Sequence, residues 1–129
     1  MKGKNKCEIT ILAVDDEPVD LKLIETALAP RGYKIITAKN GEEAVNIART
    51  QKPDLILMDI LMPKMDGYIA CSEIRKDPKT RDIPIIMITS VGHDLNKKLA
   101  DGIGATGYIV KPFMIDDLNN KINETLQSQ

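Results

Sequence analysis

Short aliphatic runs alternate with longer amphipathic stretches five times along the chain, and this alternation limits the possible folds more than any other feature. Each run has the length of a β-strand, is rich in Ile, Val or Leu, and is bounded by Gly, Pro, Asp or Asn. The five runs cover residues 9–14, 34–38, 54–58, 84–89 and 106–110. Five consecutive β-α units predict a parallel sheet with helices on both of its faces.

Helical patterns fill the intervals between these runs. The first predicted helix covers 18–29, and the second begins at Asn40, with Glu43 three residues later as in a capping box. A third is expected over about 66–76 and a fourth over about 94–103. The fifth carries the clearest apolar stripe at helical spacing, which consists of Ile115, Leu118, Ile122 and Leu126.

The composition of the runs also predicts their order in the sheet. Runs 9–14, 54–58 and 84–89 are the most continuously aliphatic, as strands buried on both faces should be. Runs 34–38 and 106–110 are more polar and suit the edges. This favours the order 2-1-3-4-5 of a doubly wound, flavodoxin-like α/β fold. We expect one domain over residues 1–129, because the pattern uses nearly the whole chain.

Composition excludes several classes of protein. Hydrophobic residues make up 43% and charged residues 29%, as in soluble globular domains, and the formal charge of −1 argues against a nucleic-acid-binding surface. Cys7 and Cys71 are too few for a disulfide framework or a metal cluster. No apolar run is long enough to cross a membrane, and no signal peptide precedes the first run. We therefore expect a cytoplasmic protein that contacts neither membrane nor nucleic acid directly.

Polar side chains stand where the predicted strands end, and functional groups gather at the carboxyl ends of strands in open parallel sheets. The residues at these ends are Asp15, Asp16, Asp59, Thr89, Ser90 and Lys111. Each has an ordinary explanation when taken alone, for instance as a helix cap or a surface lysine. Their joint placement at one sheet edge instead indicates a site.

The chemistry of this set favours a metal ion and a phosphoryl group. Two carboxylates about 4 Å apart repel by roughly 4 kcal/mol at an effective dielectric near 20, so three of them require a cation. Oxygen ligands with room for water suit Mg²⁺. Asp59 could then attack a phosphoryl group to form an acyl phosphate, with Lys111 offsetting charge on its oxygens. Thr89 is placed to donate a hydrogen bond to that group.

Four segments carry a resemblance to bacterial response-regulator receiver domains, and together they span essentially the whole chain. They are ILAVDDEP (11–18), KPDLILMDILMPKMDG (52–67), IPIIMITS (83–90) and GYIVKPF (107–113). The resemblance implies a phosphoacceptor domain of a two-component system rather than an enzyme that turns over a substrate. Its implied partners are a sensor histidine kinase or histidine phosphotransfer protein, and a downstream protein target or output domain.

The resemblance also implies the metal site. Asp59 matches the phosphoacceptor, and Asp15 with Asp16 matches the acidic pair that holds Mg²⁺ directly or through water. The backbone carbonyl of Leu61 matches a further metal ligand. Leu61 and Val91 flank the phosphoryl site and are both apolar, so neither can position an attacking water; we expect a long-lived aspartyl phosphate.

The phosphate contacts and the switch follow from the same resemblance. Lys111 matches the phosphate-binding lysine and precedes a cis bond to Pro112, while Ser90 matches a position that stays small so that phosphate can enter. Thr89 and Tyr108 match a switch pair: the hydroxyl moves toward the phosphoryl group and the ring turns into the vacated space. The surface formed by 94–103, 106–110 and the last helix is expected to bind partners, including a second copy in a weak, phosphorylation-dependent dimer.

Other interpretations require residues that this chain lacks. A phosphatase of the haloacid-dehalogenase type would need an aspartate where Leu61 stands, and a flavin-binding flavodoxin would need a neutral phosphate loop where Asp15, Asp16 and Glu17 stand. His93, the single histidine, is expected to be exposed or to cap a helix. Within the receiver class, a stand-alone regulator is slightly favoured over part of a longer regulator with a DNA-binding or enzymatic output domain.

Overall fold

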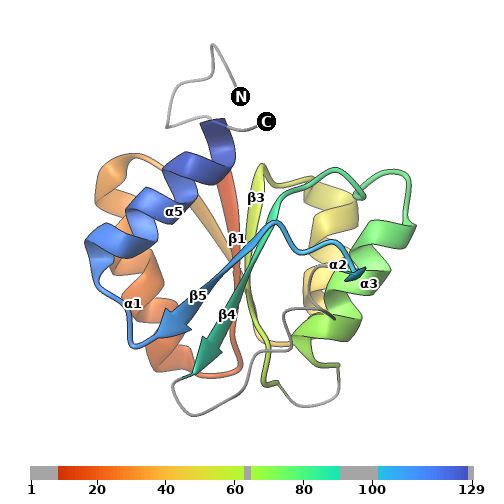
Figure 1. Ribbon diagram of the computed structural model, residues 1–129, viewed down its shortest axis with the longest axis horizontal. Helices are drawn as coiled ribbons and strands as arrows, with labels where there is room; N and C mark the ends of the chain where they lie inside the picture. The colour runs from red at the N-terminus through yellow and green to blue at the C-terminus, as the bar shows by residue number, and fades with distance from the viewer. Residues whose placement is uncertain (1–8, 63–64, 91–101, 128–129) are drawn as a thin grey trace.

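The computed structural model describes residues 9–62, 65–90 and 102–127, and its centre is a five-stranded parallel sheet (Figure 1). The strand order is β2-β1-β3-β4-β5, so the predicted order is confirmed. The strands are β1 (Thr10–Val14), β2 (Lys34–Ala38), β3 (Leu55–Asp59), β4 (Ile85–Ser90) and β5 (Gly107–Lys111).

Three of these strands lie one residue further along the chain than the sequence pattern predicted. Residue 54 was expected to open the third strand, but its carboxylate instead accepts a hydrogen bond from the Thr10 backbone N–H at 2.8 Å, just before β3 begins. As a result Asp59, Ser90 and Lys111 are each the last residue of a strand. The polar groups of the sheet edge are therefore fixed by the strand ladders themselves.

Helices cover both faces of the sheet. Within the described ranges they are α1 (Pro18–Leu28), with a 3₁₀ turn η2 (Ala29–Arg31) after it, α2 (Gly41–Gln51), α3 (Gly67–Lys76) and α5 (Ile115–Gln127). Helices α1 and α5 lie on one face, and α2 and α3 lie on the other (Figure 1). The helix predicted over 94–103 falls almost entirely outside the described residues. None of the described helices is long and apolar enough to span a membrane.

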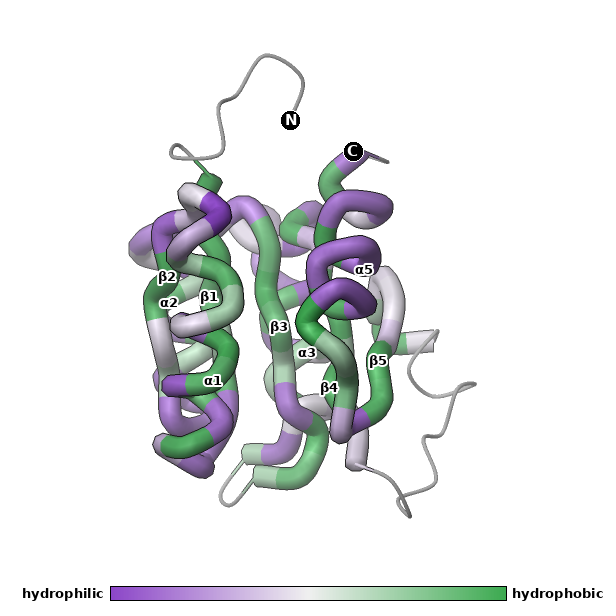
Figure 2. Tube along the Cα trace, turned by 90° about the vertical axis from the view of Figure 1, so that its left-hand side faces the viewer, coloured by the Kyte–Doolittle hydropathy of each residue, from purple (hydrophilic) through white to green (hydrophobic). Residues whose placement is uncertain are grey.

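The central strands are buried on both faces because their side chains alternate between two apolar layers. Leu55 and Leu57 pack with α1 and α5, whereas Ile56 and Met58 pack with α2 and α3, and all four are fully buried. In Figure 2 these strands are hydrophobic along most of their length, while α5 alternates hydrophobic and hydrophilic turns. Each large aliphatic side chain buried here contributes about 1.5–3 kcal/mol.

Side-chain caps fix where two helices begin. The Glu43 backbone N–H donates to Asn40 Oδ1 at 2.9 Å, so the predicted cap of α2 is confirmed, although the Glu43 carboxylate accepts from Lys39 N–H rather than from the cap residue. Asp66 accepts from the Ile69 N–H at 2.9 Å and is the cap of α3, which therefore starts at Gly67. Each such cap contributes about 1 kcal/mol.

Gly67 lets the start of α3 lie directly against the end of β3. Its N–H donates to the carbonyl oxygen of Ile60 at 2.9 Å. A Cβ at this position would lie 2.5 Å from the Asp59 carbonyl oxygen, closer than real Cβ contacts come. Because Gly67 has no side chain, α3 can begin in direct contact with the backbone of Asp59.

Candidate functional site

Strand alternation directs three charged side chains to the same side of the carboxyl edge. Asp15 follows β1, Asp59 ends β3 and Lys111 ends β5. Side chains two residues apart in a strand point to the same face, and Ala13 in β1 and Leu57 in β3 pack toward α1 and α5. Asp15 and Asp59 each lie two residues after one of these side chains and point to the same face. The register pairs Val14 with Met58, which places Asp15 beside Asp59.

Three carboxylates meet at this edge. Asp15, Asp16 and Asp59 each offer an oxygen, and these oxygens all lie within 4.8 Å of one another. Asp15 is fully buried, Asp59 is 5% exposed and Asp16 is half-buried. Neither acid after β1 caps α1: its N-cap is Glu17, whose backbone N–H donates to Asp15 Oδ1 at 2.9 Å. So many like charges at such short range favour a bound cation.

The surroundings of Asp59 disfavour its charged form. Burial, followed by the negative charge of Asp15, raises the pKa of Asp59 from its ordinary value of 3.8 to about 7. Lys111 and a hydrogen bond from the backbone N–H of Leu61 act in the opposite direction. A carboxyl group whose pKa is raised in this way is common at functional sites.

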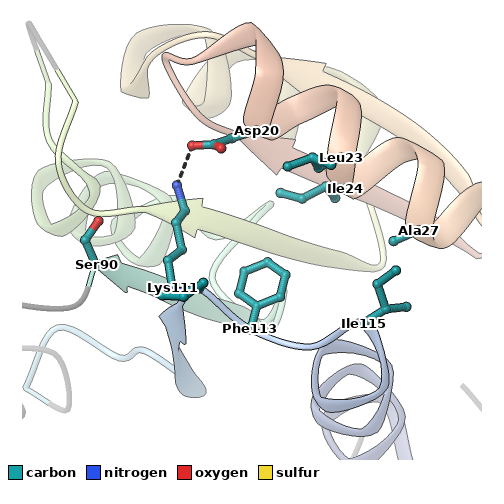
Figure 3. A pocket seen from close by; sticks show the side chains of 9 residues that line it. Asp20, Leu23, Ile24, Ala27, Ser90, Lys111, Phe113 and Ile115 are labelled. Atoms are coloured by element: carbon teal, nitrogen blue, oxygen red, sulfur yellow. Dashed lines mark hydrogen bonds and ion pairs between the residues drawn. The ribbon is translucent and has the colours of Figure 1, made fainter.

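Lys111 is bound by two carboxylates. Its Nζ donates to Asp15 Oδ2 at 2.7 Å and to Asp20 Oδ2 at 2.9 Å. Burial alone would lower the pKa of Lys111, but these two hydrogen bonds and the nearby Asp59 raise it overall, so the side chain remains an ammonium. Figure 3 shows the Asp20 carboxylate pointing at this ammonium from α1.

Asp20 was not predicted from the sequence. It is the third residue of α1, where an acidic residue reads as an ordinary partner of the helix dipole. The signal that could have found it is its place one turn beyond Asp16, at the carboxyl edge of the sheet.

A pocket of about 520 Å³ opens next to the Asp20–Lys111 pair, between α1 and the segment that follows β5 (Figure 3). Its polar end is formed by Asp20, Lys111 and Ser90. The rest of its wall is apolar and consists of Leu23, Ile24, Ala27, Pro112, Phe113 and Ile115. Ser90 faces Lys111 across the β4–β5 ladder, and the Lys111–Pro112 peptide bond is cis.

Thr89 and Tyr108 lie on the opposite face from Lys111. Tyr108 pairs with Met87 in the β4–β5 ladder, and Met87 and Thr89 share a face because they are two residues apart. Thr89 is 2% exposed, and its hydroxyl has no hydrogen-bond partner among the described residues. Tyr108 is half-buried against the α2–α3 layer.

The structure tests little of the roles predicted for three positions. The side chain of Leu61 is half exposed, and its backbone N–H donates a hydrogen bond to Asp59. Val91 and His93 lie outside the described residues. The metal-ligand role of the Leu61 carbonyl therefore stays a prediction.

The sequence model of the response regulator receiver domain matches residues 11–123. The chain belongs to the response-regulator receiver family. This match includes Asp15, Asp16, Asp59 and Lys111, and it confirms the family that the four sequence segments indicated.

Curated relatives of this receiver domain are longer proteins. A protein of Porphyra purpurea named probable transcriptional regulator ycf27 is 44% identical over 117 residues, which cover 91% of this chain and 47% of that protein. The alkaline phosphatase synthesis transcriptional regulatory protein PhoP of Bacillus subtilis is 38% identical over 91% of this chain and 48% of its own length. This chain thus spans about half the length of the curated relatives that it matches.

Solved receiver structures share the whole fold. The receiver domain of a sensor histidine kinase from Pseudomonas aeruginosa superposes with a TM-score of 0.85 at 34% identity, covering 92% of this chain and 98% of that one. That structure has a magnesium ion coordinated in its active-site cleft. The chemotaxis response regulator CheY4 of Vibrio cholerae gives a TM-score of 0.85 at 31% identity, over 91% of this chain and 98% of its own.

Proposed function

We propose that Asp59 accepts a phosphoryl group from a phosphohistidine of a sensor histidine kinase or a histidine phosphotransfer protein. The observation that carries this proposal is the cluster of Asp15, Asp16 and Asp59 within 4.8 Å, flanked by Lys111, in a chain of the receiver family. The acceptor is Asp59 because it ends the central strand β3, whereas Lys111 already occupies Asp15 Oδ2.

The same cluster fits Mg²⁺. Asp15, Asp16 and Asp59 would hold the ion with carboxylate oxygens, and the Leu61 carbonyl would be a further ligand. An all-oxygen donor set is what Mg²⁺ prefers, and the repulsion that raises the pKa of Asp59 would be relieved by a divalent cation. Bound there, the ion would neutralise charge on the phosphoryl oxygens.

Transfer is an in-line displacement at phosphorus. An Asp59 carboxylate oxygen forms a bond to phosphorus while the bond from phosphorus to the donor's imidazole nitrogen breaks, and the electron pair leaves with that nitrogen. Lys111 offsets charge on the equatorial oxygens, and the small side chain of Ser90 leaves room beside it. Because Leu61 stands where a phosphatase would need an acid, the product is stored and not turned over.

The Thr89 hydroxyl is placed to donate a hydrogen bond to the phosphoryl group. Its buried hydroxyl has no partner within the described part of the chain, and an unsatisfied buried donor costs about 1–3 kcal/mol. A phosphoryl oxygen would satisfy it, and the movement of Thr89 would leave room for Tyr108 on the same face. Phosphorylation would thereby favour one of two arrangements of the surface that includes β5 and α5.

The output of the domain is proposed by analogy with its relatives. The curated relatives are about twice as long and are named as transcriptional regulators, which supports a role in transcriptional control through an output domain or a separate protein target. The surface around β5 and α5 would contact that partner, or a second copy in a weak, phosphorylation-dependent dimer. The formal net charge of −1 does not favour direct binding of DNA by the receiver.

Intact-mass measurement after incubation with acetyl phosphate and Mg²⁺ tests the proposal. We expect one added phosphoryl group on the wild type, none after chelation and none on Asp59→Asn. Asp54→Asn is the matched control, because Asp54 lies just before the other end of β3 and contacts the Thr10 backbone instead of the cluster. Equal phosphorylation of Asp59→Asn and Asp54→Asn would refute the assignment.

A further inference from the structure

Two carboxylates share one ammonium. Lys111 Nζ lies 2.7 Å from Asp15 Oδ2 and 2.9 Å from Asp20 Oδ2, whereas Asp59 acts on it through charge without being one of these two partners. An ammonium has three N–H donors, so these two bonds engage two of them. The position of Lys111 relative to Asp59 therefore depends on both acids.

Asp20 differs from Asp15 in where it lies. Asp15 is fully buried beside Asp59, but Asp20 belongs to the first turn of α1, and its side chain is 34% exposed. It borders the pocket that separates α1 from the segment after β5 (Figure 3). Its bond to Lys111 thus directs the ammonium toward α1 and the pocket.

An ordinary explanation for Asp20 is that it interacts with the dipole of α1. A negative charge in the first helical turn is favourable, and this accounts for an acidic residue at that position. It does not account for the 2.9 Å bond to the last residue of β5. The N-cap residue of α1 is Glu17, which makes no side-chain cap bond, so capping does not explain the orientation of Asp20 either.

We propose that Asp20 is a positioning residue that holds the Lys111 ammonium toward α1 until a phosphoryl group on Asp59 competes for it. The inference rests on the proposed function of Asp59 and Lys111. In the unphosphorylated protein Asp20 stabilises the arrangement in which Lys111 points to α1. The phosphoryl oxygens must draw Lys111 away from this partner, so Asp20 lowers the rate at which the site accepts a phosphoryl group.

The rate constant for phosphorylation by acetyl phosphate and Mg²⁺ tests this proposal. Asp20→Asn and Asp20→Leu remove the charge that holds Lys111, and we expect each to raise the rate constant about twofold to fivefold, the effect of a partly exposed ion pair. Asp117→Asn removes the same charge from the exposed first turn of α5 and is expected to leave the rate unchanged. Thermal unfolding of every variant shows that it is folded.

Combining the substitution with Lys111→Ala separates action through Lys111 from a general effect of charge. Without the ammonium, Asp20→Asn is expected to leave the rate constant for phosphorylation unchanged. An equal rise in the Lys111→Ala background would overturn the proposal. So would unchanged rates in both folded Asp20 variants while the wild type is phosphorylated; no phosphorylation of the wild type would contradict the role of Asp59 itself.

Discussion

The ammonium of Lys111 lies 2.7 Å from Oδ2 of Asp15, and this pair joins the end of β5 to the first residue after β1. The two residues are 96 positions apart in the sequence. Asp15 is fully buried and the Lys111 side chain is 20% exposed, so the pair is screened little by water. It holds the Lys111 ammonium next to the acidic cluster.

Removal of Lys111 should leave a buried carboxylate uncompensated. We expect Lys111→Met to lower the free energy of unfolding by about 2–3 kcal/mol in the absence of Mg²⁺, and Mg²⁺ to recover part of the loss. Lys121→Met is the control, because Lys121 makes only a 3.9 Å surface pair with Glu124. Urea unfolding of both variants measures the difference. An equal loss in the free energy of unfolding would show that the pair with Asp15 contributes no more to stability than the surface pair.

The stability of the wild type should fall as pH rises from about 4 to about 7. Over this window folded Asp59, with its pKa raised from 3.8 to about 7, keeps a proton that the unfolded chain releases. Asp59→Asn removes this penalty, so we expect it to be more stable than the wild type by roughly 1–3 kcal/mol above pH 7 and equally stable below pH 4. Urea unfolding across this range checks it; a gain that is constant with pH would point to a cause other than ionisation.

Gly67 should tolerate no side chain. A Cβ there would lie 2.5 Å from the Asp59 carbonyl oxygen and 2.8 Å from Ile60 Cα, both of which belong to the backbone and cannot move away cheaply. We expect Gly67→Ala to cost about 2–3 kcal/mol of stability and to slow phosphorylation. Gly102→Ala, where a Cβ would meet no described atom within 4 Å, should change stability by less than about 0.5 kcal/mol. Similar melting temperatures for the two variants would disprove the close packing.

The protein should become more stable when the Thr89 hydroxyl is replaced by a methyl group. Because the hydroxyl is buried without a partner among the described residues, we expect Thr89→Val to stabilise the unphosphorylated protein by about 1 kcal/mol. The same variant should show smaller phosphorylation-induced NMR shifts in β5 and α5. Thr80→Val is the opposite case, since the Thr80 hydroxyl donates to the Ile74 carbonyl at 2.6 Å and its loss should destabilise. Phosphorylation-induced NMR shifts in Thr89→Val as large as those of the wild type would show that Thr89 takes no part in the switch.

Strand order and the composition of the acidic cluster could be predicted because both depend on short-range patterns. Strands buried on both faces read as unbroken aliphatic runs, which identified β1, β3 and β4 as central. Parallel strands then bring their carboxyl ends to one edge, so Asp15 and Asp59 could be placed together without coordinates.

Contacts between a helix and the end of a distant strand could not be predicted in this way. The bond from Lys111 to Asp20 depends on how α1 is rotated against the segment after β5, and no local pattern encodes that rotation. The clash that excludes a Cβ at Gly67 likewise depends on how closely α3 approaches β3. Burial of the Thr89 hydroxyl without a partner is a property of the packed sheet and is invisible in the residue type.

Reductive trapping of the phosphorylated protein tests the central claim most directly. Borohydride reduces an aspartyl phosphate to homoserine, so peptide mass analysis after treatment with acetyl phosphate, Mg²⁺ and borohydride identifies the acceptor residue. We expect homoserine at position 59 alone, and none when Mg²⁺ is chelated. Homoserine at position 15 or 16, or an unmodified residue 59 in protein that carries a phosphoryl group, would contradict the assignment of Asp59 as the phosphoacceptor.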